Sequence, residues 1–310
     1  MAISDQSKSA KLPSVLCAGI AVQDIILRVP HFPPPGGKSM ADEFLVVSGG
    51  CAVNAAIAVA RLGGETHYAG PLGDVSDAVS NQLVAQMKRE GIETSGVVRV
   101  AGANAPVSAI MVDSAGERMI ATYRDDRIEA ARPANPDALV ENVNVLLADN
   151  RFPDFVQPIC EASRRRNIPV VLDADRPTVE SHPLFAIATH VVFSSECLRE
   201  TTGCAELADG LQRIAPLTKA FLAVSNGPGD VLYLRDGAVL RVPAFTVNVV
   251  DTLAAGDVFH AGIALALAEG RDEVAAIRFG SAAAALKCTL FGGSAGAPHR
   301  AEVEAFLAQA

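Results

Sequence analysis

Residues 251–257 read DTLAAGD, and they are followed at once by VFHAGIALAL at residues 258–267. The first seven residues are mostly small or acidic, whereas the next ten are mostly apolar, which indicates the start of a buried helix. The first turn of a helix has N–H groups without partners and carries the positive end of the helix dipole, and small side chains let an anion approach both. The stretch therefore predicts an anion-binding site at a helix N-terminus.

Asp257 lies at this predicted anion site, where a carboxylate would repel a bound phosphate. Phosphoryl transfer gives the carboxylate a purpose, because a base takes the proton from the attacking hydroxyl while backbone N–H groups hold the transferred group. On this interpretation Asp257 is the general base, and the backbone of residues 254–257, which includes Ala254, Ala255 and Gly256, forms the anion hole. The alternative is an aspartate that caps a helix after a flexible turn. This motif alone does not decide between the two.

A second motif, SGGCAVNAA at residues 48–56, opens another predicted helix that runs to about Leu62. Together the two motifs resemble the signatures of the ribokinase (PfkB) family of sugar and nucleoside kinases, Gly-Gly-x-x-x-Asn near the N-terminus and D-T-x-[GA]-A-G-D near the C-terminus. Their order and separation match the family, and the resemblance extends from about Val15 to Leu307. It implies a three-layer αβα sandwich with a mostly parallel central sheet and a small β-sheet lid. It also implies a kinase that uses ATP and Mg²⁺.

The composition limits the classes of protein to which the chain can belong. It has 310 residues, of which 50% are hydrophobic and 20% charged, with a net charge of −9. These values are typical of a soluble globular protein. The resemblance implies one kinase domain (residues 15–310), which follows a polar tail that is expected to be disordered (residues 1–14). The acidic balance argues against nucleic-acid binding, and the lack of a long apolar stretch argues against a membrane span. Six scattered cysteines are typical of a reducing cytoplasm.

Short apolar runs alternate with helix-like segments from Val15 onward, which predicts βαβ units and a parallel sheet covered by helices. Polar residues follow several of these runs, where open α/β sheets bind their ligands. Two further β-like segments, residues 39–47 and 107–123, have no crossover helix and predict a small second sheet. In the resembled family this sheet is a lid over the sugar and often the dimer contact, which implies a homodimer. The other predicted strands are residues 15–20, 66–70, 145–148, 169–173, 191–193 and 220–225, with a β-rich segment at 238–250.

The sugar site is expected between the first strand, the lid and the N-terminal motif. Asp24 follows the first strand and would accept hydrogen bonds from two sugar hydroxyls, the alternative being an exposed loop residue. The resemblance implies that Gly49 and Gly50 let the backbone approach the sugar and that Asn54 bonds a hydroxyl from the first helical turn. Thr122, on the predicted lid, stands where a polar residue is expected.

Within the family, the chain looks most like the bacterial sulfofructose kinase branch, which phosphorylates a ketohexose that carries a sulfonate. Lys38, at the lid entry, and Arg151, just past a central strand, occupy positions where such an enzyme would bind the anion. The stretches DVFH (257–260) and ALKCT (285–289) complete the resemblance. Thr122 replaces the Asn of that branch, so neutral fructose, another ketose or a sugar phosphate stays open.

Two alternatives concern Arg151 and the activity itself. Arg151 could instead form a salt bridge to Asp149 or Asp154. A nucleoside kinase is the nearest rival function, but it needs an apolar or aromatic surface for the base, and the chain has no Trp and only 3 Tyr. A non-catalytic sugar- or nucleotide-binding protein is the rival of another class. Asp257 argues against it, because a pure binder gains nothing from a carboxylate at an anion site.

A third loop is expected to contact the nucleotide. SNGPG at residues 225–229 resembles the family's [ST]-x-G-x-x-G loop, with one residue fewer between the glycines. Ser225, Gly227 and Gly229 would let the chain turn against ATP, and the alternative is a simple turn.

The magnesium-organising segment departs from the family's pattern. Ser194 stands where the family has Asn, and Cys197 stands where it has Glu. Glu196, one residue away, is a possible substitute for that Glu. Mg²⁺ is still expected because it accompanies ATP.

A monovalent cation such as K⁺ is the last implied ligand. In many family members the Asp-Thr pair, here Asp251 and Thr252, and a Gly-rich loop, here residues 292–298, offer it backbone oxygens. The alternative for residues 292–298 is a plain loop between two helices. His260, beside the motif, is expected to be a packing residue.

Overall fold

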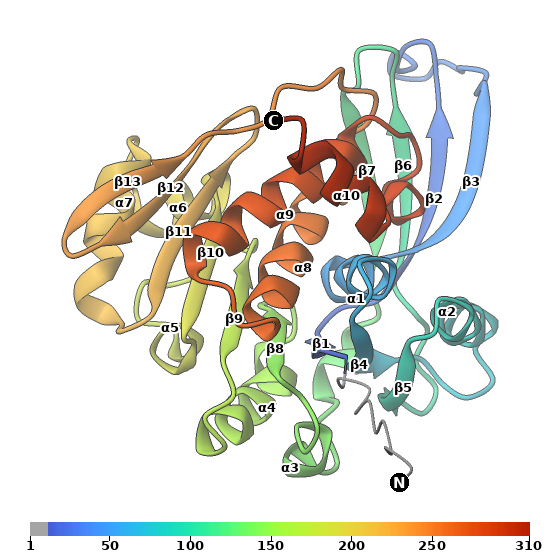
Figure 1. The fold of residues 1–310 in the computed structure, drawn as a ribbon. Helices are drawn as coiled ribbons and strands as arrows, with labels where there is room; N and C mark the ends of the chain where they lie inside the picture. Colours follow the sequence, from blue (N-terminus) through green and yellow to red (C-terminus); the bar gives the residue numbers. More distant parts are fainter. Residues whose placement is uncertain (1–11) are drawn as a thin grey trace, which may run out of the picture.

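The computed structural model describes residues 12–310, which form two β-sheets with helices around the larger one (Figure 1). The larger sheet has nine strands in the order β13-β12-β11-β10-β9-β8-β1-β4-β5. Its strands pair in parallel except for β12 and β13, which are antiparallel at one edge. These strands are β1 (Ser14–Ala18), β4 (Glu65–Leu72), β5 (Glu93–Arg99), β8 (Val145–Asp149), β9 (Val170–Ala174), β10 (His190–Ser194), β11 (Phe221–Asn226), β12 (Gly229–Arg235) and β13 (Ala238–Val242).

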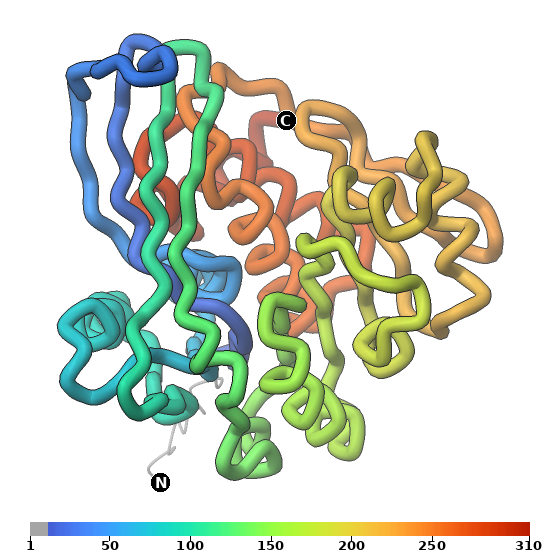
Figure 2. The backbone as a smooth tube through the Cα atoms, turned by 180° about the vertical axis from the view of Figure 1, so that it is seen from behind, coloured from blue at the N-terminus to red at the C-terminus, as the bar shows by residue number. Residues whose placement is uncertain are grey.

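Helices cover both faces of the larger sheet, as Figures 1 and 2 show from opposite sides. One apolar cluster joins one face to α1, α2, α8 and α9, and a second joins the other face to α4, α5, α6 and α7. This is the predicted three-layer sandwich with a mostly parallel sheet. The helices are α1 (Cys51–Arg61), α2 (Ala78–Arg89), α3 (Pro136–Leu139), α4 (Pro153–Arg165), α5 (Pro183–Ile187), α6 (Ser195–Thr202), α7 (Leu207–Ile214), α8 (Ala255–Ala268), α9 (Glu273–Cys288) and α10 (Arg300–Leu307), with short 3₁₀ turns η1 (Asp126–Ala130), η2 (Ala215–Leu217) and η3 (Gly293–Gly296).

The smaller sheet has four strands in the order β3-β2-β6-β7, and it projects from the N-terminal part of the molecule (Figure 1). Its central pair, β2 and β6, is parallel, and the outer pairs are antiparallel. Its strands are β2 (Val22–Arg28), β3 (Glu43–Gly49), β6 (Val107–Val112) and β7 (Arg118–Tyr123). The predicted second sheet is therefore present. Its strands β6 and β7 lie inside the expected segment 107–123, whereas β3 overlaps the expected segment 39–47 and runs on to Gly49.

Three features of the structure differ from the prediction. The chain leaves the larger sheet after β1 and enters β2 almost at once, so Asp24 lies in a strand and not in a loop. The strands β5 and β12 were not predicted, and only Ala238–Val242 of the β-rich segment 238–250 forms a strand. The predicted tail, residues 1–14, lies mostly outside the described residues.

Membrane-spanning helices were sought in the same part of the chain. None of the helices within residues 12–310 has both the length and the apolarity needed to cross a bilayer.

Candidate active site

Several of the predicted site residues gather where the strand order of the larger sheet reverses. The strand β1 lies between β4 and β8. The strands β4 and β5 extend the sheet on one side of it, and β8 to β13 extend it on the other. Crevices beyond the carboxyl ends of strands at such a point are where open α/β sheets bind ligands. Asp149 ends β8, Asp173 lies beside it in register on β9, and the N-termini of α1 and α8 face the same region.

Asp257 lies in the first turn of α8 and contacts the N-terminal motif directly. The side-chain Nδ2 of Asn54, in α1, donates a hydrogen bond of 2.6 Å to Asp257 Oδ2. Burial and the nearby charge of Asp173 raise the pKa of Asp257 to about 7, against the opposing effect of the Asn54 hydrogen bond. The two motifs predicted from sequence thus meet at one carboxylate, whose pKa suits a base that works near neutral pH.

The backbone before α8 has the features of an anion site. Ala254 precedes the helix in a left-handed conformation (φ 65°), which is rare for a residue other than glycine. The N–H of Ala255 donates to the carbonyl of Thr252 at 3.2 Å, so it is already partnered. A Cβ added at Gly256 would meet no atom within 4 Å. The open part of the predicted anion hole is therefore the backbone at Gly256 and Asp257.

Asp24 lies on the face of the smaller sheet that is turned toward this helix terminus. It pairs in register with Ser108 on β6, and Ser108 pairs with Thr122 on β7, so the three side chains form a row on one face. The hydroxyl oxygens of Ser108 and Thr122 are 2.9 Å apart. Burial and the charge of Asp257 raise the pKa of Asp24 to about 7, while a hydrogen bond from Ser108 lowers it.

The two glycines of the N-terminal motif make room for this arrangement. A Cβ at Gly49 would lie 1.9 Å from Asp24 Oδ2, so only glycine lets the carboxylate sit against the backbone. Gly50 has a positive φ of 88°, and a Cβ there would lie 2.6 Å from the carbonyl oxygen of Ile20. Gly49 is therefore required by a close contact, and Gly50 by both a close contact and its backbone conformation.

Arg151 is surrounded by carboxylates. Its guanidinium forms an ion pair with Asp175, and its backbone N–H donates to Asp149 Oδ1 at 2.9 Å. Neither residue named from sequence, Asp149 or Asp154, is its side-chain partner. Burial raises the pKa of Asp149 to about 6, and burial with the charges of Asp175 and Asp149 raises that of Asp173. The positive charge of Arg151 is thus already matched within the protein.

Lys38 lies in a different part of the β2–β3 hairpin from Asp24. It is exposed in the connection between β2 and β3, beyond the Arg28 end of the hairpin. Asp24 lies near the opposite end of the same hairpin, in register with Val47. The structure does not bring Lys38 and Arg151 together.

The residues predicted to contact the nucleotide lie along the edge formed by β10 and β11. Ser194 and Ser225 are register partners at the ends of these strands. Ser194 caps α6, since its Oγ accepts the N–H of Cys197 at 3.1 Å. Gly227 has a positive φ of 52° in the tight turn that joins β11 to β12, and Gly229 begins β12.

The positions of the family's magnesium-organising pair do not supply oxygen ligands of the expected kind. Cys197 is fully buried, and Glu196 beside it is exposed. A second group does bring carboxylates together, because ligand atoms of Cys51, Asp173 and Asp257 lie within 4.8 Å of one another. Mg²⁺ prefers oxygen, so the carboxylates of this group fit it and the thiol does not.

The predicted monovalent-cation site contains a lysine instead. The ammonium of Lys287, at the end of α9, donates to the carbonyl oxygen of Asp251 at 2.8 Å and to Asp251 Oδ2 at 3.1 Å. Thr252 is also engaged, because its Oγ1 accepts from Arg118 of β7 at 2.7 Å and its carbonyl accepts from Ala255. Burial raises the pKa of Asp251, but Lys287 and backbone N–H groups outweigh this and hold it below its usual value. The oxygens predicted to bind a metal cation therefore have protein donors.

The sequence did not identify Lys287 or Ser108 as residues of the site. Ser108 is the residue that lies in register between Asp24 and Thr122. A single lysine in the apolar segment 281–288 was an available signal, since a lysine is rarely buried without acceptors. Ser108 could be found only through the register of β2 and β6, which pairs residues far apart in sequence. His260 packs as predicted, with ring nitrogens 2.6 Å from the carbonyl oxygen of Gly256 and 3.2 Å from that of Val192.

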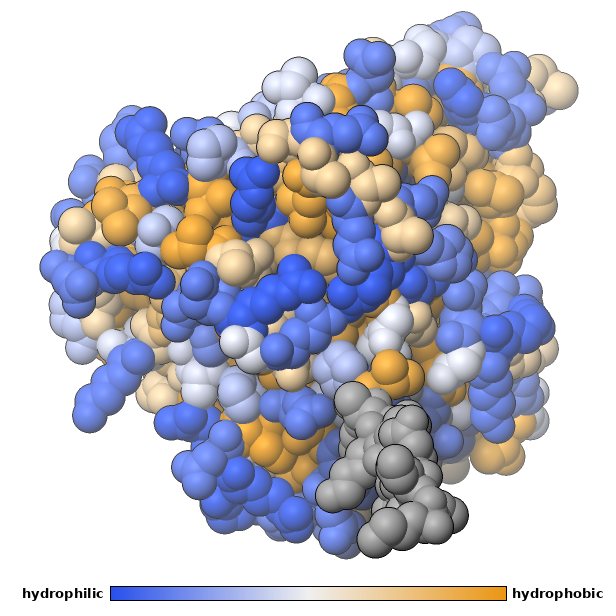
Figure 3. Space-filling model, viewed as in Figure 1, coloured by the Kyte–Doolittle hydropathy of each residue, from blue (hydrophilic) through white to orange (hydrophobic). Residues whose placement is uncertain are grey.

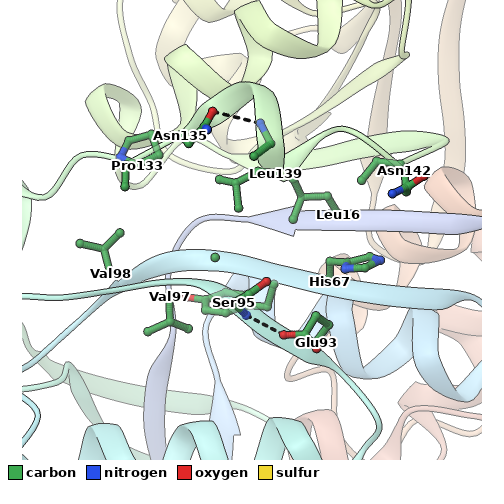
Figure 4. A pocket seen from close by; sticks show the side chains of 15 residues that line it. Leu16, His67, Glu93, Ser95, Val97, Val98, Pro133, Asn135, Leu139 and Asn142 are labelled. Atoms are coloured by element: carbon green, nitrogen blue, oxygen red, sulfur yellow. Dashed lines mark hydrogen bonds between the residues drawn. The ribbon is translucent and has the colours of Figure 1, made fainter.

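A cavity of about 440 Å³ lies elsewhere, between β4, β5 and the α3 segment (Figure 4). Its lining includes Leu16, His67, Ser95, Asn135 and Leu139. None of the residues predicted for the site lines it, so it takes no part in the function considered below.

Comparison with known proteins supports one family. The sequence profile described as pfkB family carbohydrate kinase matches residues 12–300. The ribokinase of Bacillus subtilis is 29% identical over 95% of this chain and 99% of its own. The crystal structure of an Agrobacterium tumefaciens protein, provisionally described as a ribokinase, is 37% identical with a TM-score of 0.92 over 96% of this chain and 98% of its own. A fructokinase with bound ATP from Xylella fastidiosa is 27% identical with a TM-score of 0.78 over 96% and 98%.

Proposed function

The chain belongs to the pfkB family of carbohydrate kinases, and from this premise we propose that it transfers the γ-phosphoryl group of ATP to a hydroxyl of a neutral sugar, with Asp257 as the general base. It is a phosphotransferase with an alcohol acceptor, an ATP-dependent sugar kinase. The observation that carries the proposal is the contact between Asn54 and Asp257 at the open N-terminus of α8. It joins a proton acceptor, a polar side chain and an anion site in one place.

Asp257 performs the proton transfer. Above a pH of about 7 its side chain is a carboxylate. It takes the proton of the attacking hydroxyl as that oxygen bonds to the γ-phosphorus, while the bond from the γ-phosphorus to the β,γ-bridging oxygen breaks and ADP leaves. The N–H groups at Gly256 and Asp257, with the positive end of the α8 dipole, stabilise the charge on the transferred group. General-base catalysis of this kind typically contributes about 10²–10⁴-fold to the rate.

Mg²⁺ neutralises charge on the phosphates of ATP when it is bound. Asp173, in β9, would supply a protein oxygen for it beside Asp257, in place of the family's Asn and Glu. Ser194 and Ser225 border the edge along which the nucleotide would lie, and the space beside Gly227 is open, since a Cβ there would meet no atom within 4 Å.

Asp24 and Asn54 would bind the sugar hydroxyls. Asp24 can accept two hydrogen bonds, and Gly49 leaves its carboxylate uncovered by a side chain. The side-chain Oδ1 of Asn54 is buried and has no hydrogen-bond partner among the described residues. A buried acceptor without a partner is costly, and a sugar hydroxyl would satisfy it.

The charge of the site favours a neutral substrate over sulfofructose. Arg151 is already paired, and five carboxylates lie around the site: Asp24, Asp149, Asp173, Asp175 and Asp257. Lys38, the second residue suggested to read a sulfonate, is remote and exposed in the hairpin connection. We therefore propose fructose, a neutral ketohexose, as the first candidate, with ribose, a neutral aldopentose, as the second.

The experiment is ATP turnover with matched sugars. We expect the highest kcat/KM for fructose or ribose, and a lower value for sulfofructose and for nucleosides. Arg151→Ala should then affect charged and neutral ketohexoses alike. A preference for sulfofructose that Arg151→Ala abolishes would overturn the neutral assignment. Sugar binding by calorimetry without any turnover across the panel would instead favour a non-catalytic binding protein.

We also propose a homodimer formed through the smaller sheet. Alternate residues of its strands face opposite sides, and the face with Asp24 packs against Leu253 and Phe291. Apolar surface appears in Figure 3 where β3 lies in Figure 1. The face opposite Asp24 is apolar along most of its length, with these side chains: Ile25, Leu27, Phe44, Val46, Ala109, Met111, Met119, Ala121 and Tyr123. A second copy offers the same face, and a symmetric pair covers both.

Light scattering tests the dimer. The wild-type protein should be dimeric at micromolar concentration, and Phe44→Lys with Met119→Lys should make it monomeric. Val75→Lys is the matched control, because Val75 is 71% exposed but lies outside the smaller sheet. A monomeric wild type would contradict the proposal. We place the enzyme in the cytoplasm, where ATP is available and the six free thiols would stay reduced.

A further inference from the structure

Lys287 is the most deeply buried charged side chain of the described residues. It is 0% exposed, although it belongs to a residue type that is almost never fully buried unless it is paired. Its ammonium has three donors and three acceptors: the carbonyl oxygen of Asp251 at 2.8 Å, Asp251 Oδ2 at 3.1 Å and the carbonyl oxygen of Leu290 at 3.2 Å. Every proton of the ammonium therefore has a partner.

The acceptors are of the kind that would otherwise bind a metal cation. Two are backbone carbonyl oxygens from separate segments, and the third is a carboxylate oxygen. They surround a compact positive charge, and the sequence suggested a monovalent cation at this Asp-Thr pair and the loop 292–298. A second cation beside the ammonium would be repelled at close range in a buried setting.

Asp251 links Lys287 to the active site. Its Oδ1 accepts the N–H of Leu253 at 2.8 Å, and its Oδ2 accepts the N–H groups of Gly292 and Gly293 at 3.0 and 3.2 Å. Leu253 directly precedes Ala254, whose left-handed backbone sets the start of α8. The position of Lys287 is thus linked through one carboxylate to the turn that carries the anion hole and Asp257.

The rest of the loop is held by a second side-chain cation. The guanidinium of Arg61, at the end of α1, donates to the carbonyl oxygens of Ser294, Ala295 and Ala297 at 3.3, 2.9 and 3.1 Å. Arg61 is in turn paired with Glu90 at 2.8 Å. The carbonyl oxygens on both sides of this loop are therefore engaged by protonated side chains of the chain itself.

We propose that the ammonium of Lys287 takes the place of a monovalent metal cation, as the fixed positive charge that positions Asp251 and the anion-hole turn. The enzyme then needs no K⁺ for activity. This inference rests on the proposed kinase function. Lys287 is a positioning residue, because it reaches the reacting groups only through Asp251.

The first test compares cations with the wild-type protein. Its kcat/KM for the preferred sugar in 100 mM KCl should stay within about twofold of that in choline chloride. Lys287→Ala should lose at least about tenfold in choline chloride, and K⁺ or NH₄⁺ should restore most of the loss by filling the vacated position. Lys219→Ala, which removes an exposed lysine, is the matched control and should respond to neither salt.

A second readout needs no activity. The thermal midpoint of Lys287→Ala should rise by several degrees when KCl replaces choline chloride, whereas the wild-type midpoint should not move. This measurement tests the role of Lys287 independently of the kinase assignment. The kinase assignment would be wrong if no sugar gave ATP turnover. A wild-type enzyme that is activated by K⁺ would overturn the inference. So would a folded Lys287→Ala variant that neither K⁺ nor NH₄⁺ restores or stabilises.

Discussion

Replacing Asn54 by alanine should move the acid limb of the pH–rate profile to higher pH. Asn54 Nδ2 donates to Asp257 Oδ2 at 2.6 Å, and this bond favours the ionised carboxylate. Without the donor, the pKa of Asp257 rises from its value of about 7. Because the base must be ionised, the variant needs a higher pH to reach the same rate.

The size of the shift follows from the strength of the lost bond. A hydrogen bond to a charged group contributes about 1.5–3 kcal/mol, and one pKa unit corresponds to about 1.4 kcal/mol, so the limb should move by about 1–2 units. At pH 7 the ionised fraction would fall from about one half to between about one tenth and one hundredth, a loss in kcat of about five- to fiftyfold. At pH 9.5 most of that loss should disappear.

The assay is kcat at saturating ATP and sugar from pH 5.5 to 9.5. Saturation removes the separate effect that Asn54 has on sugar binding, which appears in KM. Asp24 protonates in the same range as Asp257, so the wild-type limb belongs to both carboxylates, but only Asp257 is bonded to Asn54. Asn81→Ala, on the exposed side of α2, is the control. A loss of kcat that is equal at every pH would refute the reasoning.

Three further outcomes follow from the same geometry. Asp257→Asn should raise the thermal midpoint at pH 8 but not at pH 4. The folded pKa of Asp257, about 7, lies above its unfolded value, so the contribution of Asp257 to stability is lost as pH rises through 7. A lower midpoint of the variant at pH 8, measured by calorimetry, would contradict this. Ala254→Gly should stabilise the protein by about 1 kcal/mol in urea unfolding, because glycine adopts the left-handed backbone without strain. Gly49→Ala should raise the sugar KM at least about tenfold, since a Cβ there would lie 1.9 Å from Asp24 Oδ2, and an unchanged KM would remove Asp24 from the sugar site.

The sequence predicted the parts of the site that are encoded locally. The motifs at 48–56 and 251–257 both combine small residues with the start of a buried helix, and both helices begin within them. That their side chains Asn54 and Asp257 are hydrogen-bonded to each other is a finding of the structure that the sequence did not predict. Alternation of apolar runs likewise predicted the layered fold, because buried strands and helices keep their periods regardless of what they pack against.

The parts that depend on distant pairing could not be predicted in this way. The strand β2 is set by its neighbours β3 and β6, so the position of Asp24 in a strand has no local signal. The guanidinium of Arg151 pairs with Asp175, which directly follows β9. It does not pair with Asp149 or Asp154, which are nearer in sequence. Lys287 reaches Asp251 across 36 residues of chain, which only the fold brings together.

The most direct test of the account is transfer of the labelled γ-phosphoryl group of ATP to the preferred sugar by wild type and Asp257→Asn. The wild-type enzyme should form phosphosugar in proportion to ADP, and the variant should lose at least about a hundredfold in kcat while it keeps its sugar and ATP affinity. Far-ultraviolet circular dichroism is the control that both proteins are folded. If the folded variant kept more than about a tenth of the wild-type kcat, Asp257 would not be the general base and the central claim would be wrong.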